Sequence, residues 1–292
     1  MIRGCGSMRE KIIFPLISIV SVLLYFFQCL NLDSTNMIEP VPDDLNLLPA
    51  EIIFADFPSI SVSSINCNSL NMSTVTKHVR LRKFYGICSL KSDIILMCDL
   101  RMCNKSGLTD AKFAHDTFAT NPYCSYNFFA HSTTNSRGVG ILIKKSLNFV
   151  CLETKRDEED NNFILIRARI SNITVIIGSI YGPNKKDDNF FRRLHNALSG
   201  LGNHPTLIGG DWNATYSCLT VQNNPDVLFM QDVPNLHHSK KIREFCRDFN
   251  LSDPYRIMYP NHLEYTYVPY GTIRKNRSRL DFFLISTDIS QR

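Results

Sequence analysis

The stretch Leu207-Ile-Gly-Gly-Asp211-Trp-Asn213 decides the fold, because an apolar run passes directly into a carboxylate and an amide two residues apart. Short apolar runs of this kind are typical of strands that are covered on both faces. A strand holds its backbone rigid, so polar side chains at its end can face a common cleft. The stretch therefore predicts a buried strand that presents Asp211 and Asn213 to a functional site.

Two strand ends upstream carry polar residues in the same way. Ser-Ile-Asn66-Cys-Asn68 closes an alternating run, so we expect Asn66 and Asn68 to point to the same side. A buried run that begins at Asp93 leads into the carboxylate of Asp99. Both ends are candidates for the same cleft.

Two further groups complete the pattern. Ile180-Tyr181-Gly-Pro-Asn184 ends the run that starts at Ile173, and Ser278-Arg279-Leu-Asp281 places Arg279 and Asp281 on one face of a strand start. Taken singly, such residues are more often turn formers, helix caps or surface ion pairs. Their shared position at strand ends favours a functional interpretation.

From about Ser59 onward, short β-type runs alternate with turn clusters. We expect strands at Ile60–Asn66, Asp93–Met97, Gly138–Ile143, Phe163–Ile170, Ile173–Ile180, Thr206–Gly209 and Leu280–Ile285. Helical spacing predicts helices at Thr74–Leu90 and Asp188–Leu201, and a third helix that Ser239 caps. Asp157–Asn162 is expected to form the tip of a hairpin.

The composition excludes a disordered protein, since 44% of the 292 residues are hydrophobic and 20% are charged. The formal net charge of +5 suits a polyanionic partner without identifying one. The ten cysteines include no Cys-x-x-Cys pair and no cluster at zinc-ligand spacing. We therefore expect reduced, mostly buried thiols in a nuclear or otherwise intracellular protein.

The N-terminal region differs from the remainder of the chain. Residues 1–30 contain the apolar run Ile12–Leu30, which is either a signal anchor or a non-native extension. Residues 31–58 are rich in Pro, Asp and Asn and are expected to form a linker. Residues 59–292 then form the folded domain, and a genuine membrane-spanning segment at Ile12–Leu30 would anchor that domain to a membrane.

Taken together and in order, the strand-end motifs resemble the endonuclease/exonuclease/phosphatase family. Members of this family show Asn-x-Asn/Asp, a strand ending in Gln-Glu, Tyr-x-Pro-Asn, Gly-Asp-x-Asn, Arg-Ile/Leu-Asp and a closing Ser-Asp-His. The chain is similar in all but the last, over about Ser59 to Ile285. The resemblance implies an α/β (α+β) four-layer sandwich, in which two mixed β-sheets pack face to face and helices cover both outer faces.

The resemblance also implies roles for the matching residues. Asn66 and Asp99 would lie at a Mg²⁺ ion, with Mn²⁺ as a possible substitute. Asp211 would act as general base, Asn213 would orient water or phosphate, and Tyr181 would donate a hydrogen bond to the phosphate or leaving group. The expected substrate contacts are Asn68, Asn184 and Arg279, and Asp281 would orient the histidine of the closing motif.

Two departures from the family pattern stand out. Cys98-Asp99 replaces Gln-Glu, so the carboxylate is one methylene shorter. No Asp-His follows Asp281, and we expect a C-terminally truncated domain whose C-terminal strand is missing, which would leave a sheet edge unpaired. Loss of the histidine would remove a group that stabilises the transition state.

Within the family, Gly-Gly-Asp-Trp-Asn-Ala, Ser-Arg-Gly-Val-Gly-Ile and Ile-Tyr-Gly-Pro-Asn resemble the endonuclease domains of non-LTR retrotransposons. This resemblance implies a DNA-nicking domain that precedes a reverse transcriptase in an intact polyprotein. Two alternatives stay open: a phosphatase that acts on lipid or sugar phosphates, and a non-catalytic remnant of the fold.

Overall fold

Two six-stranded sheets form the centre of the fold. The structure is a computed structural model that describes residues 23–24, 50–52, 60–70, 77–102, 118, 125–133, 136–230, 232–268 and 276–287. The first sheet contains β1 (Leu23–Leu24), β2 (Ala50–Ile52), β3 (Ile60–Asn66), β4 (Ile94–Cys98), β5 (Tyr126–His131) and β6 (Val139–Lys144). It is mixed, because β3 and β4 run parallel whereas β6 is antiparallel to both β4 and β5.

The second sheet has the strand order β12-β14-β10-β9-β8-β7. Its strands are β7 (Phe149–Arg156), β8 (Phe163–Ile170), β9 (Ile173–Tyr181), β10 (Thr206–Asp211), β12 (Leu251–Ser252) and β14 (Asp281–Ser286). Only the β9–β10 pair is parallel. β14 pairs with β10 from Asp281 to Ile285, and β12 covers its other edge at Ile285 and Ser286.

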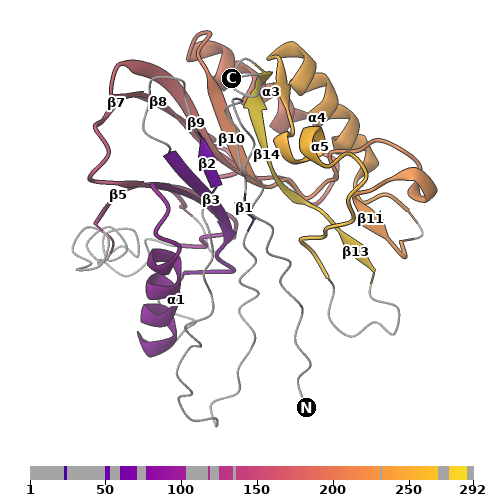
Figure 1. Cartoon of the computed structure of the whole chain (residues 1–292), viewed down its shortest axis with the longest axis horizontal. Coiled ribbons are helices and arrows are strands. Elements are labelled where there is room, and N and C mark those ends of the chain that lie inside the picture. The colour runs from indigo at the N-terminus through magenta and orange to yellow at the C-terminus, as the bar shows by residue number, and fades with distance from the viewer. Residues whose placement is uncertain are drawn as a thin grey trace.

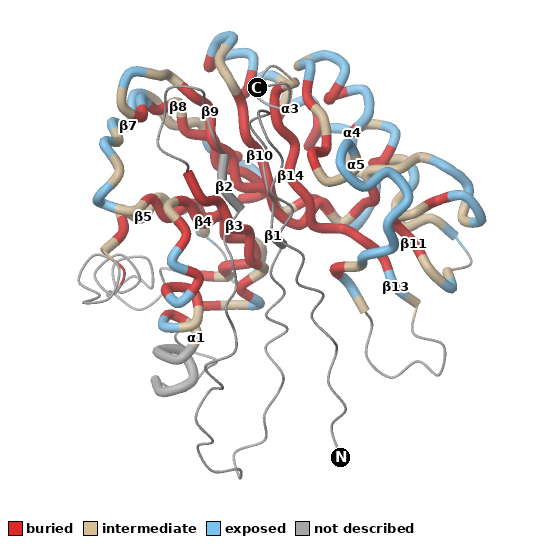
Figure 2. Tube along the Cα trace, viewed as in Figure 1, coloured by how far each residue is buried: buried red, intermediate tan, exposed pale blue. Residues whose placement is uncertain are grey.

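The core between the two sheets is built from the inward-facing residues of both. Leu96, Ile141, Ile166, Ile177 and Phe283 belong to this single buried cluster, to which strands of either sheet contribute. A second cluster lies between the second sheet and the helices that cover it. A third lies between β3, β4 and α1. These three cores separate four layers, as predicted (Figures 1 and 2).

The helices cover opposite outer faces of the sandwich (Figure 1). α1 (Lys77–Ser89) packs on the first sheet through Phe84 and Ile87. α3 (Asp188–Gly200) and α4 (Leu236–Asp248) pack on the second sheet. The structure also contains the short helix α5 (Pro254–Met258) and the 3-10 turn η1 (Val221–Asn223).

The predicted start of the third helix was wrong. Asn235, and not Ser239, is the N-cap of α4. The Ser239 side chain is buried inside the first turns, where its hydroxyl lies 3.1 Å from the hydroxyl of Thr215. A hydroxyl inside a helix can bond to a neighbouring element as readily as to the helix end, and the sequence does not distinguish the two cases.

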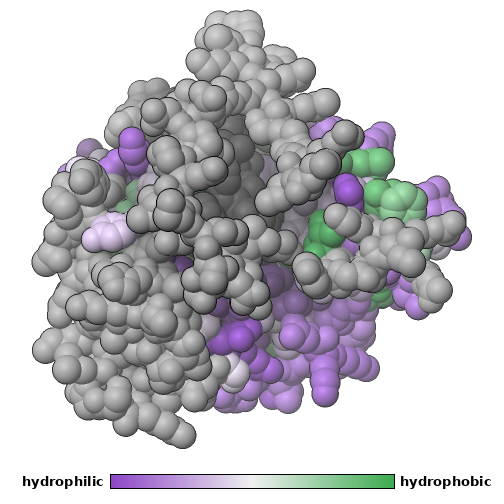
Figure 3. Space-filling view, turned by 90° about the horizontal axis from the view of Figure 1, so that it is seen from below, coloured by the Kyte–Doolittle hydropathy of each residue, from purple (hydrophilic) through white to green (hydrophobic). Residues whose placement is uncertain are grey.

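A small two-stranded sheet lies beside the main sandwich. It pairs β11 (Val227–Leu228) with β13 (Arg277–Ser278). On the side of the molecule that carries α5, β11 and β13, apolar side chains reach the surface (Figure 3). The exposed apolar residues of this region include Leu219, Phe229, Ile257 and Leu263.

Two short strands precede the predicted start of the domain at residue 59. β1 pairs with β3 in parallel and β2 pairs with it antiparallel, so Ala50–Ile52 of the predicted linker belongs to the first sheet. Apart from Leu23 and Leu24, the apolar run Ile12–Leu30 lies outside the described residues. Among the helices of the described ranges, none has both the length and the apolar character needed to cross a membrane.

Candidate active site

Strand direction brings the predicted residues to one end of the sandwich. β3 and β4 are parallel, with Asn66 opposite Cys98, and the chain continues from there into Asp99. β9 and β10 are also parallel, with Tyr181 opposite Asp211. β14 runs the other way, so its first residue, Asp281, pairs with the last residue of β10, Asp211.

Asp211 is the centre of this group. Asn66 of the facing sheet donates from Nδ2 to Asp211 Oδ2 at 3.2 Å, and the backbone N–H of Asn213 donates to Oδ1 at 2.9 Å. The Asn213 side chain donates to the carbonyl of Gly182 at 2.8 Å. A Cβ on Gly182 would lie 2.2 Å from the carbonyl oxygen of Trp212, so only glycine allows the two loops to approach this closely.

Asp281 lies next to Asp211 but has partners of its own. The hydroxyl of Thr266 donates to Asp281 Oδ2 at 3.0 Å and accepts from the backbone N–H groups of Leu280 and Asp281. Asp281 is buried, with 6% of its surface exposed. Two carboxyl groups are thus enclosed side by side at this end of the sandwich.

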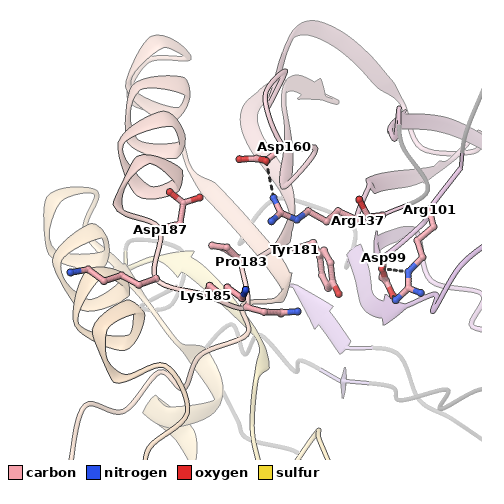
Figure 4. A pocket seen from close by; sticks show the side chains of 12 residues that line it. Asp99, Arg101, Arg137, Asp160, Tyr181, Pro183, Lys185 and Asp187 are labelled. Carbon is pink, nitrogen blue, oxygen red and sulfur yellow. Dashed lines mark hydrogen bonds and ion pairs between the residues drawn. The ribbon is translucent and has the colours of Figure 1, made fainter.

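Asp99 and Tyr181 form the opposite side of the site. Both oxygens of Asp99 accept hydrogen bonds of 2.7 Å from the guanidinium of Arg101. Figure 4 shows the Tyr181 ring between the Pro183 turn and the Asp99–Arg101 pair. These residues line a cavity of about 610 Å³, together with Arg137, Asp160 and residues 184–187.

Two predicted substrate contacts lie at the margin of the site. Asn184 is exposed and lines the cavity beside Tyr181. Asn68 is exposed beyond the end of β3, in a left-handed conformation with φ 41°, so the alternation that placed it beside Asn66 stops short of it. Its backbone N–H donates to Asn66 Oδ1 at 3.0 Å, while Lys83 holds the loop by donating to the Asn68 carbonyl at 2.8 Å.

The prediction that Arg279 contacts substrate was wrong. Only 1% of its side chain is exposed, and it forms ion pairs with Asp226 and Asp253. Its guanidinium also lies over the rings of Tyr255 and Phe282, at 5.2 Å from each centroid. The side chain is therefore enclosed by protein and cannot reach a phosphate in this arrangement.

The residues of the site that sequence reasoning missed include Arg101, Arg137, Lys185 and Thr266. Arg101 follows Asp99 by two residues, and this spacing of opposite charges was the one available signal. Thr266 lies 15 residues before its partner Asp281, in a segment without a recognisable motif. Its role depends on the fold alone.

Burial and charge together set the pKa values of the acidic groups. Burial raises the pKa of Asp211 to about 6, and the Asp99 charge adds to the rise, although hydrogen bonds from Asn213 and Asn66 offset part of it. Burial, followed by repulsion from Asp211, raises the pKa of Asp281 well above its ordinary value. Negative charge at this site is therefore incompletely compensated by the protein itself.

The same residues fit a hard divalent cation. Asn66 and Asp99, with Asp211 nearby, offer amide and carboxylate oxygens, the donor atoms that Mg²⁺ prefers. Within the described ranges, no three His, Cys, Asp or Glu side chains are grouped closely enough to hold a metal ion. This arrangement is compatible with Mg²⁺, because that ion is usually held by one or two carboxylates and keeps several waters.

A pH and magnesium dependence of stability follows from the raised pKa of Asp211. Its ordinary value is 3.8 and its folded value is about 6, so the stabilising contribution is complete below pH 3.8 and is lost as pH rises through 6. We expect the metal-free protein to be about 1 kcal/mol more stable at pH 5 than at pH 7.5 through this group. Mg²⁺ favours the ionised carboxylate, so added Mg²⁺ should stabilise the protein more at pH 7.5 than at pH 5.

Thermal unfolding at both pH values, in EDTA and in Mg²⁺, measures this effect. The Asp211→Asn variant is the internal control, because it cannot titrate at this position. An equal pH dependence in the variant and the parent protein would contradict the assignment.

Comparison with solved structures shows the same fold at low sequence identity. An AP endonuclease from Leishmania major matches with a TM-score of 0.59 and 15% identity, over 78% of this chain and 79% of that chain. An AP endonuclease from Archaeoglobus fulgidus matches with a TM-score of 0.57 and 19% identity, over 79% and 88%. The 3′ phosphatase NExo from Neisseria, bound to a product DNA hairpin, matches with a TM-score of 0.58 and 17% identity, over 79% and 88%.

The sequence itself gives the family. The profile described as "Endonuclease/Exonuclease/phosphatase family" matches residues 64–292, which include each strand end described above. The fold, with its two mixed sheets and outer helices, agrees with this match. The chain therefore belongs to the endonuclease/exonuclease/phosphatase family.

Proposed function

We propose that this chain hydrolyses phosphodiester bonds in DNA and depends on Mg²⁺ for this reaction. The observation that carries the proposal is the hydrogen-bonded group of the buried Asp211 with the half-buried Asn66 and Asn213, beside Tyr181 and Asp99. DNA as the substrate is supported by the neighbouring folds, which are AP endonucleases and a 3′ phosphatase that was solved with a product DNA hairpin.

Each central residue has a role that its surroundings support. A general base works best when its pKa lies near the working pH, and the pKa of Asp211 is about 6. Asp211 therefore takes the proton of the attacking water, and Asn213 orients that water or the phosphate. Burial and the nearby negative charges of Asp99 and Asp211 raise the pKa of Tyr181, so its hydroxyl keeps its proton and can donate to the phosphate.

Asn66 and Asp99 are the proposed ligands of Mg²⁺, and Mn²⁺ could replace it. When bound, the ion polarises the scissile phosphate and neutralises charge that develops on its oxygens. Asn68 and Asn184 remain the proposed substrate contacts at the two margins of the site. Asp281, which pairs with Asp211 across β10 and β14, remains a proposed catalytic residue.

A nicking assay tests the reaction class. Incubation with supercoiled plasmid and Mg²⁺ should convert the plasmid to open circles, whereas EDTA should stop the conversion. Tyr181→Phe should lower the rate by about 10²-fold, because one donor to the developing charge is lost. Nicking that persists unchanged in EDTA, or no nicking by the parent protein, would refute the proposal.

The finer proposal is the DNA-nicking domain of a non-LTR retroelement, acting beside a reverse transcriptase. It is supported by the resemblance of Gly209–Ala214 and Ile180–Asn184 to such domains. Three substrates separate it from its alternatives: an intact duplex, the same duplex with one abasic site, and a phosphoinositide. Cleavage of the intact duplex supports the retroelement role, a requirement for the abasic site supports a repair enzyme, and turnover of the lipid supports the phosphatase alternative.

A further inference from the structure

Tyr181 is held by a residue that the proposed chemistry does not use. Asn162 lies at the tip of the β7–β8 hairpin, where residues 157–162 connect the two strands. It is fully buried, although a polar residue at a hairpin tip is ordinarily solvated. Its main chain and its side chain both contact the backbone of Tyr181.

The contacts show how the β8–β9 ladder continues beyond its last regular pair. Phe163 pairs with Ile180, so Asn162 lies opposite Tyr181 one step further along. The Tyr181 N–H donates to the Asn162 carbonyl at 2.7 Å, as in a regular antiparallel pair. The return bond is different, because the Asn162 side-chain Nδ2, in place of its backbone N–H, donates to the Tyr181 carbonyl at 2.6 Å.

The backbone N–H of Asn162 has turned away to another partner. It donates to Asp157 Oδ2 at 3.1 Å, which closes the hairpin tip. Arg193 of α3 fixes Asp157 in turn, donating to Oδ1 at 2.7 Å. On the other side, Arg137 donates to Asn162 Oδ1 at 2.8 Å, so the amide is oriented from both ends.

The held peptide connects directly to the proposed general base. The carbonyl of Tyr181 belongs to the same peptide unit as the N–H of Gly182, which donates to the backbone carbonyl of Asp211 at 2.7 Å. One rigid peptide plane is therefore fixed by Asn162 at one end and by Asp211 at the other. Loss of either bond would let that plane turn, which changes the backbone torsion angle next to the Tyr181 side chain.

We propose that Asn162 is a positioning residue, whose side-chain amide fixes the Tyr181–Gly182 peptide and thereby sets the Tyr181 hydroxyl relative to Asp211. Alanine at this position would remove the side-chain donor to the Tyr181 carbonyl. The Tyr181–Gly182 peptide would then be held only by the bond from the Gly182 N–H to the Asp211 carbonyl. The kinetic consequence rests on the proposed function, whereas the effect on Tyr181 itself does not.

The chain offers a matched control in the neighbouring residue. Asn161 is also a buried asparagine of the hairpin tip, but its side chain accepts from the N–H and hydroxyl of Thr133, at 3.2 and 3.0 Å. Its φ of 57° lies in the left-handed region, so glycine removes the amide there without strain. Asn161→Gly thus perturbs the same tip without touching Tyr181.

The test uses 19F NMR of the protein labelled with 3-fluorotyrosine, with the Tyr181 resonance assigned by its loss in Tyr181→Phe. Asn162→Ala should shift or broaden this resonance, and Asn161→Gly should leave it in place. With plasmid substrate, Asn162→Ala should lower kcat by about 10²-fold with KM within about threefold of the parent value, since misplacement by 1 Å has that effect. Asn161→Gly should keep the parental kcat.

Each outcome decides the matter. An unchanged Tyr181 resonance in Asn162→Ala, or equal shifts in both variants, would overturn the proposal. If the parent protein does not nick DNA, the proposed function fails, while a selective shift still supports the positioning role. If Asn162→Ala does not fold, Arg137→Met replaces it, because the Arg137 side chain is 34% exposed. A shift of the Tyr181 resonance in Arg137→Met that is absent in Asn161→Gly supports the proposal, and no shift overturns it.

Discussion

The Asp211→Asn variant is expected to cleave DNA about 10²–10⁴-fold more slowly than the parent protein, the range that general base catalysis contributes. The amide of Asn has the shape of the carboxyl group but cannot accept a proton from water. The bonds from Asn66 and from the Asn213 N–H end on the Asp211 oxygens, and one amide oxygen can replace only one of them. The loss should appear in kcat under saturating plasmid.

Stability separates lost chemistry from lost fold in this variant. Burial raises the pKa of Asp211, and its charge raises that of Asp281, so removal of the charge should stabilise the metal-free protein near neutral pH. The matched control is Asp232→Asn, since Asp232 is an exposed loop carboxylate. A rate within threefold of the parent rate in Asp211→Asn would exclude Asp211 as the base.

The sequence predicted the site where the residues follow regular strands. The strands that end at Asn66, Tyr181 and Asp211 were found at nearly their observed bounds, because an alternating or an apolar run marks each of them. Parallel pairing of β3 with β4, and of β9 with β10, then brings their carboxyl ends to one edge. The family resemblance implied two mixed sheets without specifying this pairing, which hydrophobic periodicity alone does not contain.

The sequence failed where a role depends on contacts across the chain. Arg279 lies two residues before Asp281 in a strand-start motif, but its partners Asp226 and Asp253 are 53 and 26 residues away. Asn162 follows the polar stretch 157–161, which predicts a solvated hairpin tip, and its burial depends on Arg137 and Tyr181. Short polar segments carry no periodicity that would report such partners.

The buried Arg279 gives the second large expected effect, which is on stability. Arg279→Met should lower the free energy of unfolding by about 3–5 kcal/mol, because removal of one partner leaves a buried charge uncompensated. Asp253 would lose its ion pair with Arg279, whereas Asp226 would keep Arg256, which donates to it at 2.9 Å from Nε. For a chain of this size the melting temperature should fall by about 10 °C.

The directions of the pKa shifts indicate which of the two carboxylates, Asp226 or Asp253, is destabilised more by removal of Arg279. Burial opposes ionisation of both, yet two arginines hold the pKa of Asp226 below its ordinary value, while burial raises that of Asp253 despite Arg279. Asp253 thus pairs with one arginine, Arg279, and otherwise accepts from the backbone N–H groups of Tyr255 and Arg256 at the start of α5. Adding Asp253→Asn to Arg279→Met should therefore recover part of the lost stability, since the uncompensated charge is then removed.

A matched control lies two residues away. Arg277 of β13 is exposed, so Arg277→Met should change stability by no more than about 0.5 kcal/mol. Thermal unfolding and plasmid nicking of the three variants distinguish a structural from a substrate-binding arginine. If Arg279→Met had parental stability and a raised KM, the result would support Arg279 as the phosphate contact that the family resemblance implied. A large loss of stability with parental KM in the folded protein would place Arg279 in the support of β14, the strand that begins at Asp281 beside the general base.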